Sequence, residues 1–76
     1  MRCHIRLNRN YGNLGIEALE RYIRKGPTDL GMIPGTLTVK GSDLYFDVNK
    51  TRLTNSEIVY LSSMGTEMNT RPRDKK

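Results

Sequence analysis

The chain has 76 residues, of which 36% are hydrophobic and 28% are charged, and its formal net charge at pH 7 is +5. This length accommodates one small domain, and the apolar content is too high for a wholly disordered chain. No apolar run is long enough to span a membrane, and no signal peptide is predicted. A chain this short has little room for an enclosed substrate pocket beside its core, so its composition favours a binding protein over an enzyme.

The positive charge is concentrated at the two ends of the sequence. Residues 1–25 contain six basic and two acidic side chains, and residues 49–76 contain six basic and three acidic ones. The middle segment, residues 26–48, contains one basic and three acidic side chains. A positive surface attracts polyanions, so nucleic acid and acidic protein surfaces are the expected partners. A basic excess that serves only solubility remains the alternative.

Residues 2–7 alternate strictly between polar and apolar side chains, which predicts a β-strand with one buried face. The buried face is formed by Cys3, Ile5 and Leu7. The outer face is formed by Arg2, His4 and Arg6. These arginines have no acidic partner within the strand, and Asp47 is the nearest candidate on a neighbouring one. Residues 8–13 are rich in Asn and Gly and predict a turn.

Residues 14–25 predict an amphipathic helix that ends at Gly26 and Pro27. Its apolar positions recur at helical spacing: Ile16, Leu19 and Ile23, with Tyr22 beside them. Two pairs of opposite charge are four residues apart: Glu17–Arg21 and Glu20–Arg24. Acidic residues near the start and basic residues near the end also complement the helix dipole. The charges of this helix therefore have a structural explanation that requires no partner.

Residues 26–35 predict a loop, although they include the apolar residues Leu30, Met32 and Ile33. Loops are usually polar, so this apolar content needs an explanation. We favour the interpretation that these residues fold back over the core, because so small a core needs every apolar side chain. A partner-binding loop is the alternative.

Residues 36–48 predict a β-hairpin around residues 41–42, Gly-Ser, a two-residue loop that suits a type II′ turn. This register pairs Val39 with Leu44 and sorts the side chains onto two faces. The apolar face comprises Leu37, Val39, Leu44, Phe46 and Val48. The polar face comprises Thr36, Thr38, Tyr45 and Asp47.

Residues 53–64 predict a second helix, because Thr54 as the N-cap and Glu57 three residues later form a capping box. The positions expected to face the core are Ile58, Leu61 and Met64. Gly65 is expected to end the helix. Residues 66–76 have almost no apolar content and several basic residues, which predicts a disordered basic tail.

Together these elements predict an α+β fold of order β-α-β-β-α, with a three-stranded sheet and two helices on one face. The compact domain would comprise residues 1–65, and the tail residues 66–76. The sequence does not decide which strand of the hairpin pairs with residues 2–7. A small core gives modest stability that self-association would increase, so a homo-oligomer is an open alternative. The motifs identify no known family.

Side chains that would indicate catalysis are not brought together by this pattern. Cys3 and His4, the only cysteine and histidine, would point to opposite faces of a strand, so neither a metal site nor a nucleophile–base pair is expected. Asp43 and Asp47 are expected to be solvated and not a catalytic pair. We therefore expect no enzymatic activity, no metal and no cofactor. A single cysteine also fits a reducing compartment, which favours a cytoplasmic location.

The main functional hypothesis is nucleic-acid binding through a basic surface, with an aromatic side chain that stacks on bases. The candidate binding residues are Arg2, Arg6, Arg9, Arg21, Arg24, Lys25 and Tyr45. The second hypothesis is a small protein-binding inhibitor or adaptor of the phage type that acts on an acidic protein partner. Acidic residues on either side of Tyr45 weigh against a nucleic-acid platform, so both hypotheses remain open.

Overall fold

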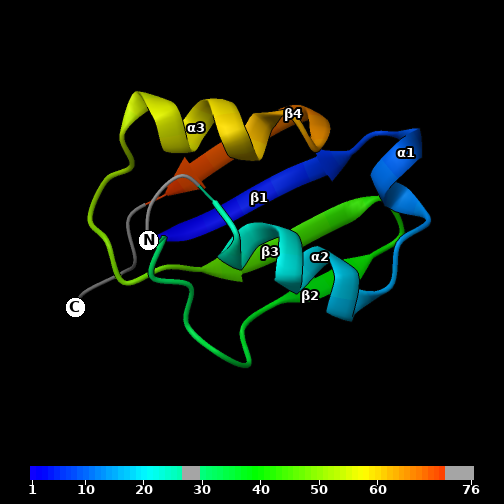
Figure 1. Cartoon of the computed structure of the whole chain (residues 1–76), viewed down its shortest axis with the longest axis horizontal. Coiled ribbons are helices and arrows are strands. Elements are labelled where there is room, and N and C mark those ends of the chain that lie inside the picture. The colour runs from blue at the N-terminus through cyan, green and yellow to red at the C-terminus, as the bar shows by residue number, and fades with distance from the viewer. Residues whose placement is uncertain (27–29, 72–76) are drawn as a thin grey trace.

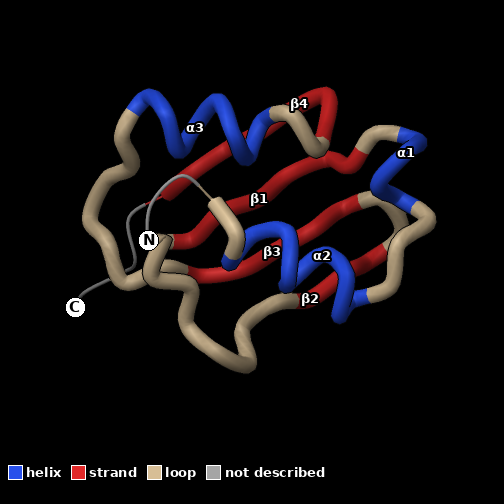
Figure 2. Tube along the Cα trace, viewed as in Figure 1, coloured by secondary structure: helices blue, strands red, loops and turns tan. Residues whose placement is uncertain are grey.

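The computed structural model describes residues 1–26 and 30–71, which form four strands and three helices (Figure 1). In chain order these are β1 (Arg2–Leu7), α1 (Arg9–Gly12), α2 (Ile16–Arg24), β2 (Thr38–Lys40), β3 (Asp43–Asp47), α3 (Asn55–Ser62) and β4 (Gly65–Arg71). The strands form one antiparallel sheet in the order β2-β3-β1-β4. Helices α2 and α3 lie over the same face of the sheet, and no described element covers the other face (Figures 1 and 2).

The predicted α+β class is confirmed, but the prediction of three strands is wrong because the sheet has a fourth. If the single turn of α1 is set aside, the order of the elements is β-α-β-β-α-β, which is the order of split β-α-β folds. Within the described ranges, no helix is long and apolar enough to cross a membrane.

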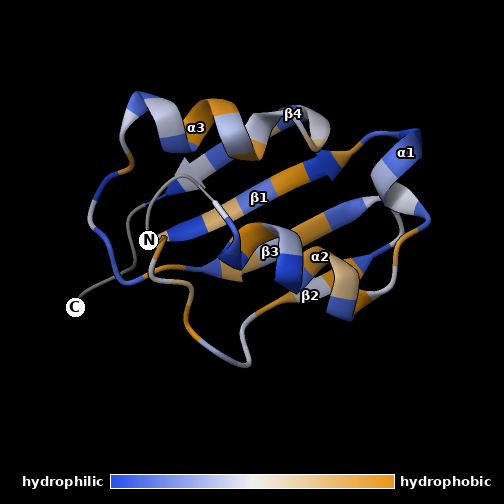
Figure 3. Ribbon diagram, in the orientation of Figure 1, coloured by the Kyte–Doolittle hydropathy of each residue, from blue (hydrophilic) through white to orange (hydrophobic). Residues whose placement is uncertain are grey.

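Strand β1 has the predicted bounds and lies inside the sheet, between β3 and β4. Its apolar residues are buried, and they alternate with hydrophilic ones along its ribbon in Figure 3. Its partner within the hairpin, which the sequence left open, is β3, with Ile5 opposite Leu44. Just before the strand, the N-terminal ammonium group of Met1 donates a 2.7 Å hydrogen bond to the carbonyl oxygen of Val48. The start of the chain is therefore fixed against β3.

Strand β4 contradicts the prediction that residues 66–76 form a disordered tail. Residues 65–71 pair with β1 along its whole length, with Met68 opposite Ile5. Met68 is half-buried and packs against the core, so one apolar side chain is enough to place this edge strand. The last part of the predicted tail, residues 72–76, lies outside the described residues.

Gly65 begins β4 and does not end the helix as predicted. Helix α3 already ends at Ser62, with Ser63 as its C-cap. A Cβ atom at Gly65 would lie 2.1 Å from the carbonyl oxygen of Arg6, so no other residue fits there without movement of the backbone. The glycine is therefore required by the close approach of β4 to β1.

The hairpin register is confirmed, since Val39 lies opposite Leu44 and Gly41 has a φ of +60°, as the first turn residue of a type II′ turn requires. Strand β2 is shorter than predicted, because at Thr36 the side-chain hydroxyl, and not the backbone, forms the hydrogen bond with β3. Its hydroxyl accepts a 3.0 Å hydrogen bond from the Asp47 amide and donates one of 2.7 Å to the Ile33 carbonyl oxygen.

Helix α2 buries Leu19 and Ile23 as predicted, but Ile16 is 51% exposed and is not a core residue. The reason is the helix start: Gly15 takes the extended conformation of an N-cap, so the helix begins at Ile16, two residues later than predicted. In the turn before it, the Asn8 side chain caps α1 by accepting hydrogen bonds from two backbone amides. Of the two charge pairs predicted in this helix, the ion pair that forms is Glu20–Arg24, at 3.0 Å.

Helix α3 begins with the predicted capping box of Thr54 and Glu57, and it buries Leu61. The prediction that Ile58 faces the core is wrong, because Ile58 is 40% exposed and Glu57 is fully buried in its place. The Glu57 carboxylate accepts a hydrogen bond from the Lys50 ammonium group and one of 2.8 Å from the Thr54 amide. A paired carboxylate thus occupies a position where an apolar side chain was expected.

The core lies between the sheet and the two long helices. It contains Met1, Cys3, Ile5, Leu7, Leu19, Ile23, Leu30, Met32, Leu44, Phe46, Val48, Leu61 and Met64. The presence of Leu30 and Met32 in this list confirms that the described part of the 26–35 loop folds back over the core, where Met32 forms an isolated β-bridge with Val48. The predicted helix stop at Pro27 lies outside the described residues.

Candidate binding site on the open face of the sheet

The face of the sheet that α2 and α3 leave uncovered is called the open face. Because side chains alternate along a strand, the outward residues of the strands form rows across the sheet. The first row is Asp47, Arg2 and Arg71; the central row is Thr38, Tyr45, His4 and Asn69; the third row is Lys40, Asp43, Arg6 and Glu67. The sheet therefore brings a polar and aromatic row together between two charged rows.

The centre of the open face is an aromatic pair. The rings of His4 on β1 and Tyr45 on β3 are stacked, with centroids 4.8 Å apart and planes inclined by 20°. Register explains this contact, since the two residues lie directly opposite each other in adjacent strands. Tyr45 remains 41% exposed, so part of this residue is accessible from solvent.

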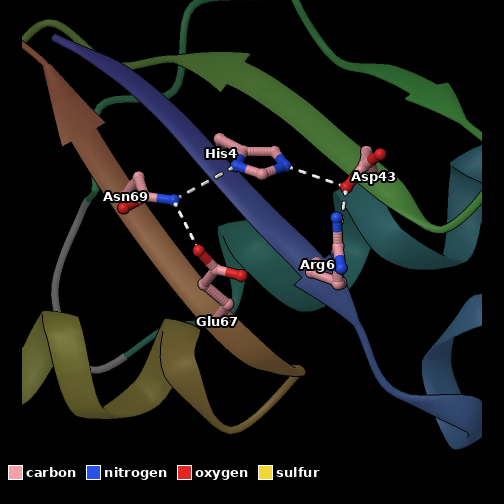
Figure 4. Close-up of polar contacts among 5 residues, drawn as sticks. All are labelled: His4, Arg6, Asp43, Glu67 and Asn69. Atoms are coloured by element: carbon pink, nitrogen blue, oxygen red, sulfur yellow. Dashed lines mark hydrogen bonds and ion pairs between the residues drawn. The ribbon is translucent and has the colours of Figure 1, made fainter.

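His4 is held in place by polar neighbours on both sides (Figure 4). Its Nε2 lies 2.9 Å from Oδ1 of Asp43, and the amide nitrogen of Asn69 lies 3.5 Å from Nδ1. Each ring nitrogen of His4 therefore has its own polar neighbour, one from β3 and one from β4. The hydrogen bond from His4, together with the nearby Arg6 charge, lowers the pKa of Asp43 below its ordinary value. These contacts hold the His4 ring against Tyr45, with the two ring planes inclined by 20°.

The first row concentrates positive charge. Arg2 lies opposite Arg71 across β1 and β4, and opposite Asp47 across β1 and β3. Among the described residues, neither arginine forms an ion pair. A depression of about 350 Å³ opens beside them, lined by Arg2, Cys3, His4, Tyr45, Asn69 and Arg71. We call it the Arg2–Arg71 pocket. It places two guanidinium groups beside the aromatic pair.

The third row is balanced in charge. Arg6 lies between Asp43 on β3 and Glu67 on β4, and its Nε is 3.7 Å from Oδ1 of Asp43. Lys40 lies opposite Asp43 from the other side. Asp47, the acidic neighbour expected from the sequence, lies opposite Arg2, whereas Arg6 has two carboxylates that were not expected beside it, Asp43 and Glu67. This end of the open face offers little net positive charge to a polyanion.

The remaining predicted binding residues lie elsewhere. Arg9 belongs to α1, Arg21 and Arg24 to α2, and Lys25 is the C-cap of α2. Helix α2 covers the opposite face of the sheet, so the structure does not join these charges to those of the open face (Figure 1). Of these residues, Arg24 is already paired with Glu20.

Two residues of the pocket, Asn69 and Arg71, were not identified from the sequence as binding residues, because their segment was interpreted as a tail. The available signal was weak: the polar residues at 67, 69 and 71 surround a single apolar side chain, Met68, with the spacing of a strand. That pattern predicts a strand only when β1 is known to pair with a second strand on its other edge.

The reactive side chains lie as the sequence predicted, on opposite faces of β1. Cys3 is buried, and that burial raises the pKa of its thiol to about 11, so the thiolate that a nucleophile or metal ligand requires is disfavoured. Within residues 1–26 and 30–71, no group of three or more His, Cys, Asp and Glu side chains could hold a metal ion. The open face thus presents charged and aromatic side chains next to one another.

No family model, curated protein or solved structure matches this chain. Function must therefore be inferred from the side chains of the open face and their geometry.

Proposed function

We propose that this protein is a non-enzymatic binding module that takes single-stranded nucleic acid on the open face of its sheet. The observation that carries the proposal is the stacked His4–Tyr45 pair at the centre of that face, with Arg2 and Arg71 in the adjoining pocket. A single buried cysteine fits a reducing compartment, so a cytoplasmic location accompanies this proposal.

The aromatic pair supports recognition of unpaired bases. A base that stacks on an aromatic side chain contributes about 1–3 kcal/mol to binding, and it tolerates any sequence because every base has a π face. Four-stranded sheets with aromatic residues on an open face are a common solution for binding single-stranded RNA. Tyr45 offers its exposed ring face, and His4 supports it from β1. Paired bases in a duplex are already stacked and cannot use this surface.

The arginine pair supports recognition of the phosphate backbone. A guanidinium group presents several N–H donors in a planar fork that fits phosphate oxygens. Arg2 and Arg71 have no ion-pair partner among the described residues, so contact with phosphate breaks no existing salt bridge there. Two such contacts would give the dependence of log Kd on log salt a slope of magnitude about 1.4, as expected for single strands.

The test is the anisotropy of short fluorescent single strands, titrated with the protein and its variants. We expect Tyr45→Ala to weaken binding about 5- to 150-fold, which corresponds to the loss of one stacked base. Arg2→Ala should also weaken binding and reduce the salt dependence by about one contact. The matched control is Arg9→Ala, which removes an exposed arginine of α1 that does not belong to the open face and should bind as the parent does.

Two outcomes would reject the proposal. One is the absence of binding to single strands at low salt, and the other is binding that is unaffected by both Tyr45→Ala and Arg2→Ala. An acidic peptide that binds in an Arg2-dependent manner while nucleic acid does not would favour the alternative, a protein-binding inhibitor or adaptor.

A further inference from the structure

The charges of the open face are arranged unevenly along the strands, and this arrangement restricts how an anion can lie on it. The first row carries two arginines that face each other across β1 and β4 and one carboxylate, Asp47, so its net charge is positive. The third row sets Asp43 and Glu67 on the two sides of Arg6. A strand of nucleic acid that crossed all three rows would bring its phosphates beside these carboxylates. Phosphate is therefore favoured at one end of the face only.

The aromatic pair lies next to that favoured end. His4 follows Arg2 by two residues on β1, and Asn69 precedes Arg71 by two on β4, so the central and first rows are about 7 Å apart along the strands. Rows this close can hold the phosphate and the base of one nucleotide. The Arg2–Arg71 pocket is lined by residues of both rows. Its volume of about 350 Å³ lies at the low end of the range for small-molecule sites, about 300–1,000 Å³.

We infer that the Arg2–Arg71 pocket receives the terminal phosphate of a single strand, while the terminal base stacks on Tyr45. This inference rests on the proposed function and narrows it from single strands in general to their phosphorylated ends. A terminal phosphomonoester carries about −1.5 to −2 charges at pH 7 and three acceptor oxygens. An internal phosphodiester carries one charge and leaves two oxygens free. Two guanidinium groups in one pocket match the terminal group better in both charge and donor number.

The polarity of the strand is not set by these contacts. A phosphate on the 5′ or on the 3′ end has the same charge and oxygen geometry, so both satisfy the arginines equally. The remainder of the strand would leave the sheet past Tyr45 without approaching Asp43 and Glu67. The experiment therefore compares strands that carry the phosphate at the 5′ end with strands that carry it at the 3′ end.

The test compares one single-stranded sequence in three forms: with a 5′ phosphate, with a 3′ phosphate, and with hydroxyl groups at both ends, each labelled at an internal position. Binding is measured by anisotropy at pH 7.5 and low salt. We expect one phosphorylated form to bind about tenfold or more tightly than the hydroxyl form, the gain that charge-assisted hydrogen bonds provide. That gain should be lost in Arg2→Ala and in Arg71→Ala. It should persist in Arg6→Ala, the matched control on the same strand and face.

Equal affinity for all three forms, with the Tyr45 dependence intact, would overturn this inference and leave the proposed function standing. A phosphate gain that survives in the Arg2→Ala, Arg71→Ala double variant would place the phosphate elsewhere and also overturn it. If none of the three forms binds, the inference and the proposed function fail together. The exposed arginines are outside the core, and thermal melting of each variant verifies that it is folded.

Discussion

The buried ion pair of Glu57 and Lys50 provides a demanding test of the fold. Glu57 is 0% exposed, and its carboxylate accepts hydrogen bonds from the Lys50 ammonium group and the Thr54 amide. Lys50→Met keeps the length of the side chain and removes the charge, so the buried Glu57 carboxylate loses its ion pair with Lys50. The Thr54 hydrogen bond would remain, but a neutral donor does not replace the charge of Lys50.

The magnitude follows from the burial of the two partners. Loss of one partner of a buried pair costs about 3–5 kcal/mol. Because the Lys50 side chain is 31% exposed, water can replace part of its contribution, and we expect the lower end, about 3 kcal/mol. A domain of this length has a total stability of about 4–11 kcal/mol. The expected fall in Tm is about 12–24 °C.

The assay is thermal melting followed by far-ultraviolet circular dichroism, with urea unfolding as a second measure. Lys40→Met is the matched control, since Lys40 is exposed on β2 and the same substitution there should change Tm little. Replacing the pair as Lys50→Met with Glu57→Leu should restore much of the loss, because apolar substitutes for a buried ion pair are often neutral. If the Tm of Lys50→Met equalled that of Lys40→Met, the reasoning would be refuted.

Two further predictions concern acid stability and the edge of the sheet. The hydrogen bond from His4 and the Arg6 charge lower the pKa of Asp43 in the folded state below the ordinary 3.8, so the stabilisation is complete above that value and is lost as the pH falls further. The free energy of unfolding, measured at a series of acidic pH values, should therefore fall more steeply with decreasing pH in the parent than in Asp43→Asn. Parallel curves of this free energy against pH would contradict the prediction. Truncation after Met64 removes β4 and the contact of Met68 with the core, so the truncated chain should lose its cooperative melting transition, whereas a disordered tail would be removable without effect.

The parts of the fold that the sequence predicted correctly depend on short-range patterns. Strand β1 follows from strict alternation, the hairpin from a two-residue Gly-Ser loop between apolar runs, and the start of α3 from the spacing of Thr54 and Glu57. Each pattern lies within a dozen residues, so local chemistry determines it. Strand β4 lacks such a pattern, because an edge strand with one half-buried apolar residue is stabilised mainly by backbone pairing with β1.

The position of Glu57 shows a different limit. Residues 57 and 58 can both face the same side of a helix as Leu61, and hydrophobicity alone favours Ile58. The structure buries Glu57 because Lys50, seven residues earlier in the connecting loop, supplies its counter-charge. A pairing that depends on the course of a loop is not visible in the periodicity of the helix.

Several residues of the candidate site were predictable from the sequence, but their arrangement next to one another was not. Alternation places Arg2 and His4 on the outer face of β1 and Tyr45 on that of β3, as predicted. Whether these residues meet depends on the register between strands that are about forty residues apart, which no local signal determines. The same register gives Arg6 its carboxylate neighbours and Arg2 the facing Arg71.

The pairing of Arg2 with Arg71 leads to a last prediction that separates a functional from a structural role. Like charges directly opposite on antiparallel strands destabilise the sheet by about 0.2–1 kcal/mol. Arg71→Ala removes that repulsion and should raise Tm by about 1–8 °C at low salt, an increase that added salt reduces. Arg6→Ala should change Tm in the opposite direction, because it removes the ion pair with Asp43.

The two arginine variants are also expected to differ in binding, with the affinity for a single strand falling in Arg71→Ala and persisting in Arg6→Ala. Parallel melting and anisotropy measurements on the same protein samples give both quantities. A side chain whose removal stabilises the fold and weakens binding contributes to ligand binding and not to the stability of the sheet. Such a trade-off is typical of functional sites. If Arg71→Ala lowered Tm as Arg6→Ala does, Arg71 would be a structural residue of β4, and the positive end of the open face would lose its main evidence as a phosphate site.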